Sequence, residues 1–124
     1  MTDRTPYRAF IDGLVEVSRL NVDADQIRAN GHAERTNTRD LPLSADEQAR
    51  KALLLSLDRN GREIVARMLE VERQAAIHDV LAHLDWAVAA DRLDLGAGGT
   101  SFADLAEDSF HFDFIARVAA DPWP

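Results

Sequence analysis

The sequence predicts a mainly α-helical protein: a compact bundle of four or five helices around a long central helix, with a small β-hairpin before the C-terminal helix. Two observations predict this class. The run from Arg62 to Arg92 contains neither Gly nor Pro, and such a run is typical of an uninterrupted helix, since these residues end helices. Elsewhere, apolar residues recur at helical spacing behind capping residues. A chain of 124 residues is the size of one domain, so residues 1–124 are expected to form a single helical domain.

The first helix is expected to begin at Thr5, a capping residue followed by Pro6 in the first turn, and to end near Leu20. Its apolar face consists of Tyr7, Phe10, Ile11, Leu14 and Val15, spaced at 3.6 residues per turn. A short helix over residues 25–30, stopped by Gly31, is expected next. Residues 32–40 are expected to form an exposed, mobile loop.

The third helix has a clear start signal. Ser44 is followed three residues later by Glu47, the spacing of a capping box. A helix from Ala45 to about Leu57 is therefore expected, and its buried residues should be Ala52, Leu53, Leu54 and Leu57. Asp58 should cap the helix that follows.

The long helix carries two apolar faces when its residues are placed at about 100° per residue. One face contains Ile64, Met68, Val71, Ala75, Ala82, Trp86 and Ala89. The other contains Leu69, Ile77, Val80, Leu81, Leu84 and Val88. Two apolar faces predict neighbours on both sides, which makes this the central helix. The alternative, that the excess apolar face buries a second copy in a homodimer, stays open.

The last third of the chain predicts a hairpin and a final helix. The alternating residues 93–95 and 100–102 flank the glycine cluster Gly96–Gly99, which is typical of a β-hairpin. A helix from Asp108 or Ser109 should follow, with its inward residues being Phe110, Phe114, Ile115 and Val118. The alternation of phenylalanines at 110, 112 and 114 leaves a strand as the competing interpretation. Trp123 should tuck into a groove and hold the C-terminal tail.

Composition and charge exclude several classes of function. The absence of Cys excludes disulfides and thiolate metal sites and favours a reducing compartment. No secretory signal and no apolar run of about 20 residues is present, so the protein is expected to be soluble and cytoplasmic. The net charge of −8 disfavours nucleic acids and anionic membranes. It suits a basic protein partner that is approached by electrostatic steering.

Two His/Asp pairs are the candidates for a ligand-binding or hydrolytic pocket. His78 is followed by Asp79, and His111 lies two residues before Asp113. An imidazole that is oriented by a carboxylate can act as a general base. Arg73 and Arg117 could each present a guanidinium to an anionic ligand, although structural ion pairing is the favoured interpretation of both.

A metal site is the weaker chemical hypothesis. Glu72, Asp79 and His83 lie within about 40° of one another on the long helix. Such a stripe could supply some ligands of a divalent ion, completed by residues from elsewhere. A solvated stripe with a local Asp–His pair is the favoured interpretation, because a metal needs three or four converging ligands. No cofactor is expected.

The residues also carry a resemblance to a family. The segments concerned are Met68–Glu70, Glu72–Arg73, Ala76–Asp79, Leu81–Ala82, Trp86, His111, Asp113–Phe114, Arg117 and Asp121–Pro124, with Phe10–Val15 near the start. They resemble a family of small bacterial proteins of unknown function. The resemblance implies a stand-alone bacterial domain, and it supplies no established activity and no catalytic residues to carry over.

The hypothesis favoured by the sequence is a non-enzymatic protein-interaction module of an immunity or regulatory type. Its acidic surface would bind a basic partner. The alternative is a small-ligand or metal-binding pocket, with hydrolysis as one of its activities. That pocket would be lined by His78, Asp79, His111 and Arg117.

Overall fold

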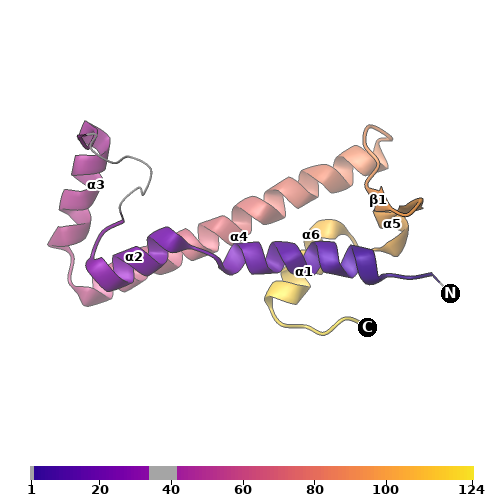
Figure 1. Ribbon diagram of the computed structural model, residues 1–124, viewed down its shortest axis with the longest axis horizontal. Coiled ribbons are helices and arrows are strands. Elements are labelled where there is room, and N and C mark those ends of the chain that lie inside the picture. Colours follow the sequence, from indigo (N-terminus) through magenta and orange to yellow (C-terminus); the bar gives the residue numbers. More distant parts are fainter. Residues whose placement is uncertain (1, 34–41) are drawn as a thin grey trace. The chain divides into compact units, whose positions relative to one another are not determined.

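The computed structural model describes residues 2–33 and 42–124. Along these residues the elements follow one another as Figure 1 shows: α1 (Thr5–Arg19), α2 (Val22–Asn30), α3 (Ala45–Ser56), α4 (Arg59–Ala89), β1 (Gly96–Ala97), β2 (Thr100–Ser101), α5 (Phe102–Leu105) and α6 (Phe110–Val118). The mainly α class, the long helix and the hairpin before the last helix are confirmed. Most of the predicted loop of residues 32–40 lies outside the described residues. None of the described helices is both long and apolar enough to cross a bilayer.

The chain divides into two compact units. Unit 1 consists of Met1–Leu20 with Gln74–Pro124, and unit 2 consists of Asn21–Arg73. Helix α4 contributes residues to both units. The single domain over residues 1–124 stays a prediction.

Helix α1 begins at Thr5 as predicted, but its cap is different. Asp3 Oδ1 accepts a hydrogen bond from the Thr5 backbone N–H at 2.9 Å, whereas Thr5 itself lies inside the first turn. The carboxylate therefore satisfies a backbone donor that the helix leaves unpaired. The predicted apolar face is confirmed, since Tyr7, Ile11 and Val15 are buried.

The core of unit 1 is formed by α1, α4, α5 and α6. Its buried residues are Tyr7, Ile11, Val15, Leu81, Phe102, Leu105, Phe110 and Phe114. The Tyr7 ring packs edge-on against Phe102, with centroids 5.7 Å apart. Most of this core is aromatic or aliphatic surface removed from water, which is the main stabilising contribution to the unit.

Helix α6 resolves the competing strand interpretation. Ser109 Oγ accepts from the Phe112 N–H at 3.3 Å, as expected of a residue that caps a helix. Phe110 and Phe114 face inward as predicted, but Ile115 is exposed. Its prediction as a core residue was wrong because Ile115 lies about 100° around the helix from Phe114.

The hairpin is shorter than the alternation predicted. β1 and β2 pair antiparallel, with Gly96 opposite Ser101 and Ala97 opposite Thr100. Gly98 and Gly99 form the turn, with φ of 59° and 82°. Two successive positive φ values are what a two-residue hairpin turn requires, and glycine adopts them without strain. The single-turn helix α5 that follows was not predicted.

In unit 2, helix α2 begins three residues earlier than predicted. The side chain of Asn21 caps it by accepting from the Ala24 N–H at 3.0 Å. Gly31 ends the helix in the left-handed conformation, with φ of 81°, as predicted. Ala24 and Ile27 are buried against Ala66 of α4.

Helix α3 departs most from expectation. The capping box is confirmed, since Ser44 Oγ accepts from the Glu47 N–H at 3.1 Å. However, none of the described residues of α3 is fully buried. Ala52 and Leu53 are exposed, Leu53 by 60%, while Leu54 and Leu57 are half-buried. The prediction failed because three leucines in a row span about 200° of a helix, and one neighbouring surface covers only part of that arc.

Helix α4 begins at Arg59, where Asp58 Oδ1 accepts from the Gly61 N–H at 2.7 Å, which confirms the predicted cap. Its second predicted face is partly buried: Ile77, Leu81, Leu84 and Val88 pack in unit 1, although Leu69 and Val80 are exposed. Its first face is largely exposed, including Ile64, Met68, Val71 and Trp86. The expectation that one chain covers both faces was therefore wrong, because the α4 residues that join the core of unit 1 all belong to its second face.

Candidate functional site

The structure brings His78 and His111 together. His78 lies on α4 and His111 in the first turn of α6, and their rings meet edge to face with centroids 5.1 Å apart. His78 Nδ1 lies 3.2 Å from Asp79 Oδ1. Both imidazoles are half-buried, whereas Asp79 is exposed. Three of the sequence candidates therefore lie in one cluster.

Asp85 organises this cluster and was missed by the sequence reasoning. Its Oδ2 lies 2.5 Å from His111 Nδ1, and its two oxygens accept from the backbone N–H groups of Phe110 and His111 at 2.9 and 3.1 Å. The carboxylate thus caps α6 and orients the imidazole. With Nδ1 engaged, Nε2 is the ring nitrogen left for a proton or a ligand. The available signal was spacing, because Asp85 lies two helical turns after His78 on the same face of α4.

Asp113 is a buried structural acceptor. Its Oδ2 accepts from the Tyr7 hydroxyl at 2.5 Å and from the Glu107 N–H at 3.0 Å, and its Oδ1 accepts from the Asp108 N–H at 3.1 Å. Burial and the hydrogen bond to Asp113 raise the pKa of Tyr7 well above its ordinary value. This carboxylate ties α1, α6 and the preceding turn together.

Arg117 belongs to a second structural cluster at the C-terminal tail. Its Nε donates to Asp12 Oδ1 at 2.8 Å, and the Trp123 indole N–H donates to Asp12 Oδ2 at 3.0 Å. The guanidinium groups of Arg8 and Arg117 lie 5.3 and 5.2 Å from the Trp123 ring centroid. Partial burial opposes ionisation of Asp12, but the hydrogen bonds from Arg117 and Trp123 hold its pKa below the ordinary value. The predicted docking of Trp123 is confirmed.

The remaining candidates lie apart from the histidine cluster. Arg73 belongs to unit 2 and is exposed. The ring of His83 packs near Trp86, with centroids 5.6 Å apart, and Glu72 is exposed. Over residues 2–33 and 42–124, no group of three or more His, Asp or Glu side chains could hold a metal ion. Glu72, Asp79 and His83 are therefore not brought together as a ligand set.

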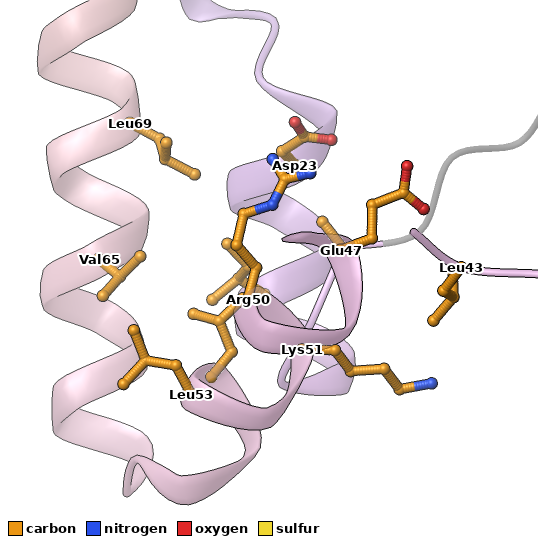
Figure 2. Close-up of a pocket in the computed structure, with 11 residues that line it drawn as sticks. Asp23, Leu43, Glu47, Arg50, Lys51, Leu53, Val65 and Leu69 are labelled. Carbon is orange, nitrogen blue, oxygen red and sulfur yellow. The ribbon is translucent and has the colours of Figure 1, made fainter. Parts of the chain in front are cut away.

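A groove in unit 2, lined mainly by apolar side chains, is a candidate binding cavity. Its volume is about 320 Å³, which is within the usual range for ligand cavities. Side chains from α2, α3, α4 and the segments next to α2 and α3 line it (Figure 2): the apolar ones are Ile27, Ala33, Leu43, Leu53, Leu54, Val65 and Leu69, and the charged ones are Asp23, Glu47, Arg50 and Lys51.

The walls of this groove are held in place by polar contacts of α2 and α4. Arg28 Nε donates to Glu63 Oε2 at 2.8 Å, and Arg28 also pairs with Glu70. Arg62 donates to the backbone oxygens of Leu54 and Leu55 at 3.1 and 3.3 Å, which anchors the end of α3 to α4. α3 is thus attached to α4 at its C-terminal end.

The acidic charge is concentrated in unit 1. This unit contains 12 acidic and 5 basic side chains, whereas unit 2 contains 10 acidic and 9 basic ones. Net charges of −7 and −1 follow. The long-range negative field of the chain therefore originates mainly from unit 1, and the groove lies in a nearly neutral unit.

Comparison with known proteins gives a family and no function. The model of a family described as a family of unknown function (DUF6547) matches residues 1–124. No curated protein and no solved structure matches the chain significantly.

Proposed function

We propose that this chain, which belongs to the family of unknown function DUF6547, is a non-enzymatic protein-interaction module that binds a helix of a basic protein in the groove of unit 2. The observation that carries the proposal is the packing of α3. This helix has 12 residues and buries none of them, and its Leu53 is 60% exposed beside the groove. Most helices in proteins owe their stability to a packed apolar face. In our proposal, the bound partner covers the exposed apolar residues of α3.

The chemistry of the groove suits the apolar side chains of a helix. Leu53 of α3 faces Val65 and Leu69 of α4 across the cavity, which Leu54 also lines. A groove between two helices accepts apolar residues spaced at i, i+3 or i+4, and i+7 on a third helix. A few such anchors, enclosed by a polar rim, supply most of the binding free energy in an interface.

Charge favours a basic partner. The net charge of −8 raises the rate at which a basic protein meets this one. Asp23 and Glu47 line the groove beside Arg50 and Lys51, and their carboxylates would attract lysine or arginine side chains that flank the anchors. Binding by an acidic protein to a basic one is the type of recognition expected of an immunity or regulatory protein.

A ligand or hydrolytic pocket is supported less well by the contacts. The Asp113 carboxylate already accepts hydrogen bonds from Tyr7 and two backbone N–H groups, and the Arg117 guanidinium already donates to Asp12 and to the C-terminal tail. Only His78, Asp79 and His111 remain together. The pocket lined by all of the candidates stays a prediction.

The test is a binding measurement with a designed probe. A fluorescein-labelled helical peptide, with leucines on one face and lysines on the other, is titrated with the protein and followed by fluorescence anisotropy. We expect binding that weakens with added salt. Leu53→Asp should weaken it at least about tenfold, because it places a charge in the apolar groove.

The control is Leu93→Asp, which makes the same change at an exposed leucine of unit 1. It should leave the affinity unchanged. Equal losses in the two variants, or no binding by the wild-type protein at about 100 μM, would reject the groove as the binding surface. A peptide with glutamates in place of the lysines that binds as tightly would reject the basic partner.

A further inference from the structure

Helix α4 carries an apolar stripe in unit 2 that is separate from the groove. Ile64, Met68 and Val71 are 49%, 64% and 64% exposed. At about 100° per residue, the centre of this stripe lies roughly 110° around the helix from Val65 and Leu69, which line the groove. Three large apolar side chains on successive turns form a continuous exposed surface of the kind that marks an interaction site.

We propose that a second copy of this chain covers the stripe and that the two α4 helices form a parallel two-stranded coiled coil. The spacing supports this arrangement. Positions 64, 68, 71 and 75 are separated alternately by four and three residues and hold Ile, Met, Val and Ala, whereas the next position of the series, His78, packs against His111 of its own chain. An average spacing of about 3.5 residues keeps a seam facing a partner helix over several turns.

The charges beside the stripe are complementary between copies. Arg67 precedes the core position of Met68, and Glu72 follows the core position of Val71. In a parallel, in-register coiled coil these two flanking positions face each other across the seam. Arg67 of each copy would therefore meet Glu72 of the other, twice by symmetry. Arg67 already pairs with Glu63 at 3.2 Å, and its guanidinium has further donors for a second carboxylate.

An antiparallel pair would lose this complementarity. It brings flanks of the same kind together, so that Glu72 would no longer meet Arg67 of the second copy. Within unit 2 the 10 acidic and 9 basic side chains nearly cancel, so two copies of this unit meet without net repulsion. The pairing of Arg67 with Glu72 thus favours a second copy in the parallel orientation.

Sedimentation equilibrium of the full chain tests the proposal. Val71→Glu places a charge in the seam, and Val80→Glu makes the same change at a valine of α4 that is 60% exposed but lies on another face. We expect the wild-type protein and the Val80→Glu variant to be dimers and the Val71→Glu variant to be a monomer. Because Val71 is exposed in the single chain, the Val71→Glu variant should keep the helical circular dichroism of the wild-type protein. A monomeric wild-type protein, or equal dissociation of both variants, would overturn the proposal.

Disulfide trapping tests the orientation. The chain has no cysteine, so Met68→Cys introduces a single thiol at the seam. In the parallel pair the two thiols face each other within the Cα separation that a disulfide allows. We expect a covalent dimer on mild oxidation, and no more than background with Val80→Cys. The parallel arrangement would be overturned if the Val80→Cys variant formed a covalent dimer as fast as the Met68→Cys variant. It would also be overturned if the Met68→Cys variant dimerised in solution but formed no disulfide.

Discussion

Replacing Asp113 by alanine should destabilise unit 1 by about 3 kcal/mol, because it leaves buried donors without an acceptor. The Asp113 carboxylate accepts from the Tyr7 hydroxyl and from two backbone N–H groups, those of Glu107 and Asp108. Tyr7 is fully buried, so its hydroxyl has no access to water as a replacement acceptor. An unsatisfied buried donor costs about 1–3 kcal/mol. The two backbone donors belong to exposed residues, and they add less because water can reach them.

Urea unfolding followed by circular dichroism at 222 nm measures this loss. Tyr7→Phe removes one donor and keeps the ring, so we expect a smaller loss of about 1–2 kcal/mol. In the Asp113→Ala background Tyr7→Phe should cost less than it does alone, since the acceptor is already gone. Asp104→Ala, at an exposed aspartate of α5, should change the free energy of unfolding by less than about 0.5 kcal/mol. A loss below about 1 kcal/mol for Asp113→Ala would refute the assignment of this carboxylate as a buried acceptor.

Two further outcomes follow from the titrating groups of unit 1. Tyr7 is the only tyrosine of the chain, and burial together with its hydrogen bond to Asp113 raises its pKa above the ordinary 10.0. Absorbance at 295 nm should therefore show no phenolate in the folded protein near pH 10. The free energy of unfolding should fall above that pH, because only the unfolded chain ionises freely. Ionisation with an ordinary midpoint in the folded protein would contradict the burial. The pKa of Asp12 is held below 3.8, so its contribution to stability is present above that pH and is lost as the pH falls through the lower folded value. In a Trp86→Phe background, Asp12→Ala at neutral pH should shift the fluorescence emission of Trp123 to longer wavelength, and an unchanged emission maximum would show that the tail does not depend on this carboxylate.

The sequence predicted the elements well where local signals determine them. Ser44, Asp58 and Gly31 mark the ends of helices through hydrogen bonds or a left-handed backbone conformation that involve only nearby residues. The docking of Trp123 was also predicted, because an indole combines a large apolar ring with one N–H donor and gains from packing against neighbouring residues.

The sequence predicted less well which faces are covered. An apolar face on a helix indicates that something packs there, but it does not distinguish the same chain from a partner. Leu53 and Met68 were expected inside and are exposed. For the same reason the groove was not predicted, since its apolar lining residues have the sequence pattern of ordinary core residues.

The candidate site was predicted in part. The contact of His78 with His111 joins residues 33 positions apart, and no local pattern specifies it. Asp85 was overlooked because it lies within an apolar stretch and its partners, the first N–H groups of α6, become visible only when the two helices are packed together. A capping carboxylate supplied from another element leaves almost no signal in the sequence around the helix that it caps.

The most direct test of the central claim, that another copy of the chain covers the exposed face of α4, uses the methyl group of Met68. The chain has two methionines, so a methyl-labelled sample gives one signal for Met68 and one for Met1. A soluble gadolinium chelate broadens the signals of methyl groups that are exposed to solvent. We predict that the broadening of the Met68 signal decreases as the protein is concentrated through its dimerisation range, and that Val71→Glu abolishes this protection. A Met68 methyl that stays equally accessible to the chelate at every concentration would contradict the claim.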